Sequence, residues 1–208
     1  MLYYDKHFGN GCRIAIWHVT EELEELYYLL PDDEKVRKEA NSRFKSLSRI
    51  LEWTAVRVLL CDMLDRQLDI IYDASGAPHL PEYEGMDISI SHTKGYVAIG
   101  LSQHGEIGID VEQISPRVEK VRSRFIRDDE DAVSLNKQLL HWSAKETAFK
   151  MLHRKKVDFL KHLKISPFIE SEEGVFQLQE SRTDENQVFD INYKVFPEFV
   201  LTYSCTEL

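Results

Sequence analysis

The sequence has few cysteines, and none of them stands at the spacing of a metal ligand. Cys12, Cys61 and Cys205 are the only three among 208 residues. They are odd in number and far apart, whereas zinc ligands recur at short, regular intervals. The histidines show no pairing at such intervals either. We therefore do not expect a zinc site.

The sequence also lacks a long apolar run and a net positive charge. No stretch approaches the roughly 20 apolar residues that a membrane span needs. Residues 1–5 do not begin a basic region followed by an apolar core, as a signal peptide would. The net charge of −10 disfavours non-specific binding to nucleic acid or to anionic membranes. We expect a soluble, cytoplasmic globular protein with neither nucleic acid nor membrane as a partner.

Basic residues nevertheless gather in two segments. The first contains Arg117, Lys120, Arg122, Arg124 and Arg127, with Glu119 as its one acid. The second contains Arg154, Lys155, Lys156, Lys161 and Lys164, opposed by Asp158. Such clusters are commonly solvated faces. The functional alternative is a patch for an anionic ligand or an acidic protein partner.

Residues 140–152 predict a helix, because their apolar members recur at helical spacing. Glu146 and Lys150 are four residues apart and share one face of it, and Lys145 lies near the edge of that face. An ordinary surface ion pair would explain this spacing. The alternative is a site that uses a carboxylate and an ammonium group together.

A second pair of acids favours that alternative. Residues 107–112 alternate and are rich in β-branched side chains, which predicts a strand, and on a strand Asp110 and Glu112 point to the same side. Together with Glu146 and Lys150 they could form a site for a hard cation beside a proton donor.

Patterning predicts the remaining elements. We expect strands at 12–19, 69–72, 88–92, 96–101, 163–167, 175–178, 188–195 and 199–204, and helices at 21–30, 31–44 and 47–67, with short helices in 115–135. The helix at 47–67 displays Arg49 and Arg57, which could grip a phosphate or simply extend to solvent. His92 ends a strand beside a turn, where polar side chains often gather around a ligand.

Two short self-similarities suggest a duplication, although chance is an open alternative. Residues 53–57 (Trp-Thr-Ala-Val-Arg) resemble residues 142–146 (Trp-Ser-Ala-Lys-Glu), and the strand starts Tyr96-Val97 and Phe199-Val200 are alike. A helix followed by strands thus occurs twice. We expect two similar α+β halves that meet near residue 105.

Three stretches together resemble the 4′-phosphopantetheinyl transferase superfamily, in its monomeric, pseudo-duplicated Sfp-type class. They are residues 88–92 (Ile-Ser-Ile-Ser-His), 107–112 (Ile-Gly-Ile-Asp-Val-Glu) and 142–150 (Trp-Ser-Ala-Lys-Glu-Thr-Ala-Phe-Lys). The resemblance implies an α+β fold of two similar α/β halves related by pseudo-twofold symmetry. Residues 1–105 would supply coenzyme A phosphate contacts, and residues 106–208 the magnesium-binding and catalytic motifs.

The resemblance also implies an activity: transfer of 4′-phosphopantetheine from coenzyme A to a serine of an apo acyl, peptidyl or polyketide carrier protein, with Mg²⁺, releasing adenosine 3′,5′-bisphosphate. The implied Mg²⁺ ligands are Asp110, Glu112 and Glu146. The implied catalytic residues are Glu146, Lys150 and Lys145. The implied coenzyme A contacts are Arg49, Ser91, His92, Lys145 and Lys150. Arg117 to Arg127 would attract the carrier.

One departure from the family pattern concerns a turn, and two alternative functions stay open. The family often has Gly-Lys-Pro where this chain has Gly76-Ala77-Pro78. Loss of that lysine would weaken coenzyme A binding by about 1.5–3 kcal/mol unless His79 or Arg49 compensates. The alternatives are a non-catalytic relative that binds coenzyme A or a carrier, and a Mg²⁺-dependent nuclease.

Overall fold

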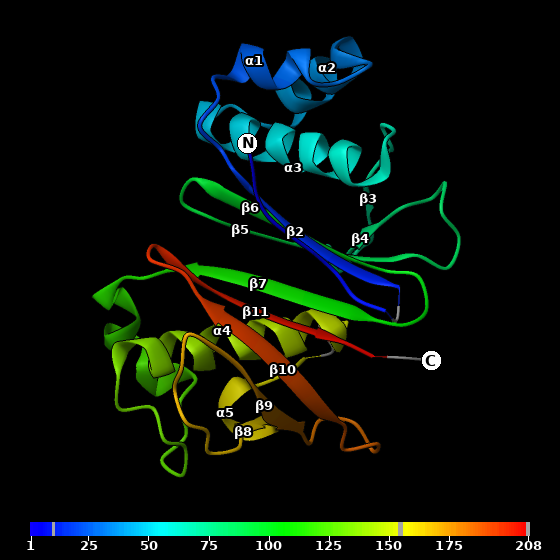
Figure 1. The fold of residues 1–208 in the computed structure, drawn as a ribbon. Coiled ribbons are helices and arrows are strands. Elements are labelled where there is room, and N and C mark those ends of the chain that lie inside the picture. The colour runs from blue at the N-terminus through cyan, green and yellow to red at the C-terminus, as the bar shows by residue number, and fades with distance from the viewer. Residues whose placement is uncertain (10, 154–155, 207–208) are drawn as a thin grey trace. The chain divides into compact units, whose positions relative to one another are not determined.

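The computed structural model describes residues 1–9, 11–153 and 156–206 and has the predicted mixture of helices and sheets. The chain divides into two compact units, Met1–Gly105 and Glu106–Thr206. Each contains its own sheet, one long helix and one apolar core (Figure 1). No helix among the described residues is long and apolar enough to cross a membrane.

The sheet of the first unit has four antiparallel strands in the order β1-β2-β6-β5. Their bounds are β1 Leu2–His7, β2 Cys12–His18, β6 Tyr96–Ser102 and β5 Asp87–Thr93. A separate two-stranded hairpin consists of β3 (Ile71–Tyr72) and β4 (Pro78–His79). The patterning predicted β2, β5 and β6 but missed β1, whose residues are mostly exposed and carry no clear apolar face.

Helices cover this sheet in two layers. The long helix α3 (Leu47–Leu64) packs on β2 and β6, and α1 (Leu23–Tyr28) and α2 (Asp33–Arg43) pack on α3 (Figure 1). Helix α2 follows Pro31 and begins at Asp32, whose carboxylate accepts a hydrogen bond from the Lys35 N–H at 3.2 Å. Helix α3 ends before the predicted residue 67, because Asp65 adopts a left-handed conformation with φ of 52°.

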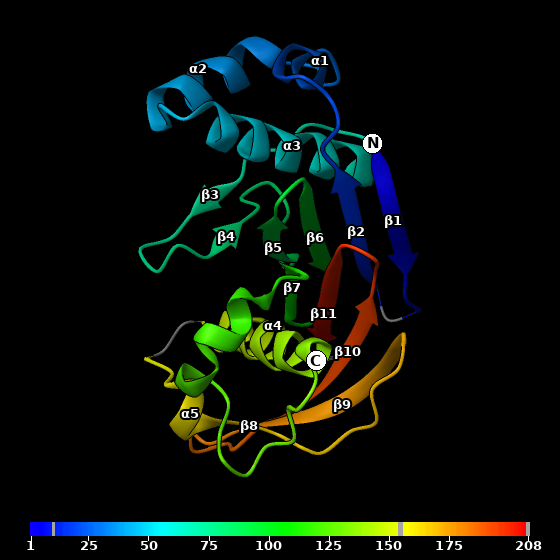
Figure 2. The ribbon, with the colours of Figure 1, turned by 90° about the vertical axis from the view of Figure 1, so that its left-hand side faces the viewer.

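The second unit has a five-stranded antiparallel sheet in the order β7-β11-β10-β9-β8. Its strands are β7 Ile107–Gln113, β8 Leu163–Ile165, β9 Glu173–Glu180, β10 Val188–Val195 and β11 Phe199–Cys205. Helix α4 (Leu135–Met151) lies along one face of this sheet (Figure 2). The segment between β7 and α4 forms two 3-10 helices, η1 (Pro116–Lys120) and η2 (Arg122–Arg124), and a short α5 (Phe159–His162) follows α4.

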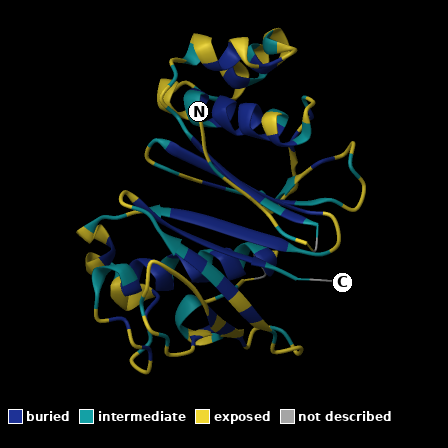
Figure 3. Cartoon of the chain, in the orientation of Figure 1, coloured by how far each residue is buried: buried dark blue, intermediate teal, exposed yellow. Residues whose placement is uncertain are grey.

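A glycine sets the distance between α4 and β7. A Cβ atom added to Gly108 would lie 2.6 Å from the Thr147 carbonyl oxygen and 2.7 Å from Cγ of Met151, closer than side chains tolerate. Absence of a side chain therefore lets the helix pack directly on the strand. The helix and the inner strands are accordingly buried along most of their length (Figure 3).

The two units share a connection pattern. In each, a strand leads through a long helix to an antiparallel hairpin, and the last strand of that hairpin pairs with the first strand. The order β2-β6-β5 thus matches β7-β11-β10. Trp53 and Trp142 lie in the two long helices, and Tyr96 and Phe199 begin the two corresponding strands. The weak self-similarity of the sequence reflects this common topology.

Candidate active site

Strand β7 and helix α4 place two carboxylates and an ammonium group together. Asp110 and Glu112 both project from β7 toward α4, where the Lys150 Nζ donates to Asp110 Oδ1 at 2.9 Å and the Trp142 Nε1 donates to Glu112 Oε1 at 2.6 Å. Ile109 and Val111 are fully buried between them. The two acids thus share the helix-facing side of an edge strand.

Lys150 lies in the last turn of α4 and is held by two oxygen atoms of β7. Besides the Asp110 carboxylate, its Nζ contacts the Ile109 carbonyl oxygen at 2.7 Å. The Lys150 side chain is 17% exposed and that of Asp110 only 7%. Because both groups are largely desolvated, the ion pair is fixed in position rather than averaged over rotamers.

Glu112 experiences the charges around it. Its pKa is raised to about 7 because it is buried, and Asp110 and Glu146 raise it as well, which outweighs the Trp142 hydrogen bond and the positive charge of Lys150. The carboxyl group therefore changes protonation near neutral pH. Glu112, Asp110, Glu146 and Lys150 lie close enough to act on one another electrostatically.

The residues fit a hard cation by their chemistry but do not form a finished metal cluster. Across residues 1–9, 11–153 and 156–206, no three His, Cys, Asp or Glu side chains are grouped as they would be around a metal ion. Asp110, Glu112 and Glu146 nevertheless offer only carboxylate oxygens, the ligands Mg²⁺ prefers. The mutual repulsion that raises the Glu112 pKa is what a divalent cation would relieve.

A buried layer of hydroxyl groups joins α4 to the sheet beside this site. Thr202 stands opposite Asp110 in the β7–β11 register. The hydroxyl of Thr202 is 2.8 Å from that of Ser143 and 2.7 Å from that of Thr147, both on α4. All three residues are fully buried. The layer fixes how far α4 can slide along the sheet, and hence where Lys150 meets Asp110.

Lys145 does not belong to the site, contrary to the expectation of a catalytic or phosphate contact. Its side chain is completely buried, and its Nζ lies 2.8 Å from Glu130 Oε2 and 2.6 Å from the Phe125 carbonyl oxygen. Glu130 also accepts hydrogen bonds from the N–H groups of Arg127 and Ile165, each at 2.8 Å. The rotation that separates Lys145 from Glu146 turns it into the core.

In the first unit, the structure brings together two of the three residues expected to hold coenzyme A phosphates. Arg49 Nη1 lies 3.5 Å from His92 Nε2 beside a pocket of about 140 Å³. Glu52, which the sequence did not single out, lines the same pocket and lies 3.8 Å from Arg49 and 3.9 Å from His92. Ser91 is buried and alternates with His92 along β5, so the two side chains point to opposite faces of the sheet.

Arg57 is a structural arginine. It is 5% exposed, its guanidinium lies 3.1 Å from the centre of the Trp53 ring, and its Nη1 donates to the Trp53 carbonyl oxygen at 3.1 Å. Burial lowers its pKa to about 10. In the turn at Ala77, the ring of His79 lies 3.3 Å from the Asp73 carboxylate, which occupies the histidine that was expected to replace the missing lysine.

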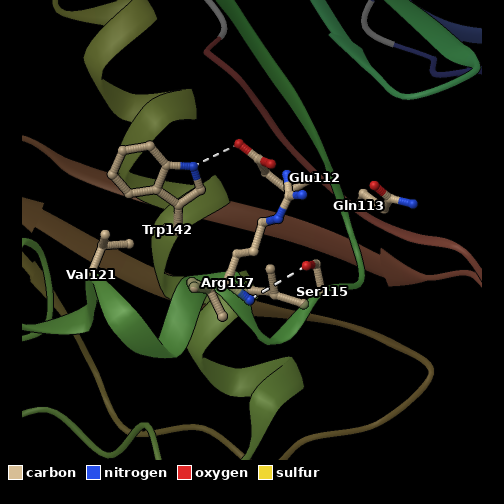
Figure 4. A pocket seen from close by; sticks show the side chains of 8 residues that line it. Glu112, Gln113, Ser115, Arg117, Val121 and Trp142 are labelled. Carbon is tan, nitrogen blue, oxygen red and sulfur yellow. Dashed lines mark hydrogen bonds between the residues drawn. The ribbon is translucent and has the colours of Figure 1, made fainter.

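A pocket of about 320 Å³ opens next to Glu112 (Figure 4). Figure 4 shows Glu112 and Trp142 on one side of it and Arg117 reaching across from η1. The full lining consists of Glu112, Gln113, Ser115, Arg117, Val118, Val121, Leu139 and Trp142. Its inner wall is apolar, since Val118 and Leu139 are buried members of the core.

Sequence reasoning missed the supporting roles of Trp142, Glu52 and Glu130. Trp142 stood in the helical motif, but nothing in its spacing indicated a hydrogen bond across to β7. Glu52 lies three residues after Arg49, a helical spacing that could have indicated the contact. Glu130 is 15 residues from Lys145 in a segment without periodicity, and no local signal joins the two.

The second basic segment behaves as a solvated face. Lys161 lies 3.8 Å from Asp158 and Lys164 lies 2.7 Å from Asp129. Both lysines and both acids are largely exposed, so these pairs contribute little to stability. Arg154 and Lys155 lie outside the described residues.

Comparisons with known proteins point to one family. Residues 106–204 match the family model described as the 4′-phosphopantetheinyl transferase superfamily. A Synechocystis sp. protein named provisionally as a 4′-phosphopantetheinyl transferase is 34% identical over 110 residues, 49% of this chain and 45% of its own length. The 4′-phosphopantetheinyl transferase AcpT of Salmonella typhi is 35% identical over 69 residues, 33% of this chain and 36% of its own length. AcpT of Escherichia coli K12 is 37% identical over 65 residues, 31% of this chain and 33% of its own. This chain spans between a third and a half of the length of the curated relatives it matches.

Proposed function

Because the chain belongs, through residues 106–204, to the 4′-phosphopantetheinyl transferase superfamily, we propose that it transfers 4′-phosphopantetheine from coenzyme A to a serine of an apo carrier protein. The other product is adenosine 3′,5′-bisphosphate. The proposal includes a cytoplasmic location and a monomeric state, both of which rest on the family resemblance.

One observation carries the proposal: a desolvated lysine and two carboxylates meet at the β7–α4 contact. Lys150 lies 2.9 Å from Asp110, and Glu112 is held at 2.6 Å by Trp142 on the same helix. Phosphoryl transfer needs little covalent help from a protein and depends on positioning and on compensation of charge. A strand edge and a rigid helix supply both.

In the reaction, the serine oxygen attacks the phosphorus that carries pantetheine, and the bond to the departing adenosine bisphosphate breaks. Glu146 is half-buried on α4 and lies close enough to Glu112 to influence its pKa. We assign it the proton of the serine hydroxyl, taken directly or through a water molecule. Lys150 would neutralise charge on the departing phosphate. Mg²⁺ bound to Asp110, Glu112 and Glu146 would supply further charge compensation at the pyrophosphate.

The pocket beside Arg49 and His92 supports a role in binding the phosphates of coenzyme A, although Glu52 reduces its positive charge. Ala77 supplies no charge at the turn where the family often has lysine. We therefore propose that coenzyme A binds more weakly here than in relatives with the Gly-Lys-Pro turn, by roughly ten- to a hundredfold.

The test is to incubate the protein with Mg²⁺, coenzyme A and a panel of apo acyl, peptidyl and polyketide carriers, and to measure intact masses. At least one carrier should gain the mass of one phosphopantetheine group, and the variants Asp110→Asn and Glu112→Gln should abolish the gain. Carriers that bind without gaining mass would favour the non-catalytic alternative. Cleavage of plasmid DNA with no modified carrier would favour a nuclease.

A further inference from the structure

The surface around the pocket beside Glu112 combines an apolar hollow with uncompensated positive charge. The hollow is walled by Val118, Val121, Leu139 and the Trp142 ring. Arg117 lines its mouth. Val121 and Trp142 are half-buried, so both the mouth and the inner wall are accessible from solvent.

Four cations stand on this segment without acidic partners. Arg117, Lys120, Arg122 and Arg124 are all exposed. Within residues 1–9, 11–153 and 156–206, none of them forms a salt bridge, whereas the lysines of the other basic segment lie beside aspartates. In a chain with a net charge of −10, an exposed group of unpaired cations is a local exception that favours an acidic partner.

We propose that this pocket and its four cations are the docking surface for the carrier protein, with one apolar side chain of the carrier in the pocket and its acidic side chains against the cations. This inference rests on the proposed function and names how its protein substrate is selected. It predicts that acidic carriers with an exposed apolar residue next to the acceptor serine are preferred.

The composition of the pocket excludes a free anion as its occupant. Glu112 forms part of the wall, and its negative charge, when ionised, would repel a phosphate or carboxylate placed inside. The apolar walls instead fit an aliphatic or aromatic side chain, the usual anchor of a protein interface. Negative charge on the partner must therefore lie outside the pocket, where Arg117, Arg122 and Arg124 are exposed. Nucleic acid is disfavoured by the acidic charge of the chain as a whole.

The position of the pocket couples docking to chemistry. Glu112 belongs both to the pocket lining and to the carboxylate group of the candidate active site. A carrier anchored there would present the residues beside its anchor to Asp110 and Lys150. Loss of docking should then raise the KM for the carrier and spare the KM for coenzyme A.

The experiment compares three variants of the full-length protein. Arg122→Glu with Arg124→Glu reverses two of the cations, and Val121→Glu places a charge in the pocket. The matched control, Lys161→Glu with Arg182→Glu, reverses two exposed cations elsewhere in the second unit. The probe is the apo carrier that the wild type modifies in the mass assay. A fluorescein-labelled acidic apo acyl carrier protein serves for binding by anisotropy.

We expect the arginine reversal and Val121→Glu each to raise the KM for the carrier about tenfold or more, while the control stays within about twofold of the wild type. The KM for coenzyme A should be the same in all four proteins. Added NaCl should weaken wild-type binding and leave the arginine-reversed variant almost unaffected.

Binding and turnover fail separately, so the two proposals can be told apart. If carriers bind the wild type but are not modified, weaker binding by the arginine reversal keeps the docking surface and removes the transferase. If carriers are modified but the reversal behaves like the control, the docking surface is wrong and the transferase stands. If no acidic carrier binds at all, the docking surface is wrong.

Discussion

The buried ion pair between Lys145 and Glu130 should be the most sensitive point in the second unit. Both side chains are completely buried. Glu130→Gln keeps the shape of the side chain but removes its charge, and so leaves the Lys145 ammonium without a counter-ion. Breaking a buried pair from one side costs about 3–5 kcal/mol, because the remaining charge stays desolvated. Contacts of Lys145 with the carbonyl oxygens of Phe125 and Phe159 offset part of that cost.

The measurement is thermal unfolding followed by circular dichroism. For a unit of about 100 residues each kcal/mol shifts the midpoint by roughly 4–8 °C, so Glu130→Gln should lower it by more than about 10 °C. Burial lowers the pKa of Lys145 even beside Glu130. Removing Glu130 lowers it further, so the loss should be larger near about pH 6, where the lysine is charged, than near about pH 9.

Two comparisons decide whether this reasoning is right. Glu173→Ala removes the acid of a partly exposed pair with Lys194 and should cost only about 0–1 kcal/mol. The double variant Lys145→Met with Glu130→Gln removes both charges and should be more stable than Glu130→Gln alone. The reasoning fails if Glu130→Gln unfolds at the same temperature as Glu173→Ala, or if the double variant is the least stable of the three.

Three further predictions concern the site, the turn and a surface loop. Lys150→Ala removes the positive charge beside Asp110 and should reduce the transfer rate by about 10²-fold or more in the mass assay; a change below about threefold would exclude Lys150 from the chemistry. Ala77→Lys restores a charge at the turn and should lower the KM for coenzyme A about tenfold; an unchanged KM would place the coenzyme A phosphates elsewhere. Burial raises the pKa of Glu180, but hydrogen bonds from Thr183 and from neighbouring backbone N–H groups lower it by more, so its folded pKa is below the unfolded one. Its stabilisation is therefore present above the unfolded pKa of about 4.3 and is lost as the pH falls through the folded value. The midpoint difference between wild type and Glu180→Gln should shrink on acidification, and a constant difference would contradict this.

The sequence by itself determined the parts of the site that depend on local geometry. Alternation along 107–113 set Asp110 and Glu112 on one side of a strand, and apolar spacing in 140–152 predicted the helix that carries Lys150. Both follow from backbone periodicity, which is a property of a few consecutive residues. The repeated helix-and-hairpin pattern was visible for the same reason. Strand β1 escaped because its residues carry no such pattern.

Only the tertiary structure decided which polar side chains meet a partner and which are enclosed. Spacing placed Lys145 at the edge of a functional face, but Glu130, from a distant segment, buries it in an ion pair. Likewise Trp142 bonds to Glu112, and Glu52 joins Arg49 at their pocket, through packing between separate elements. The period of a helix or strand fixes the direction of a side chain. What that side chain meets depends on elements brought there by folding, and no local pattern records them.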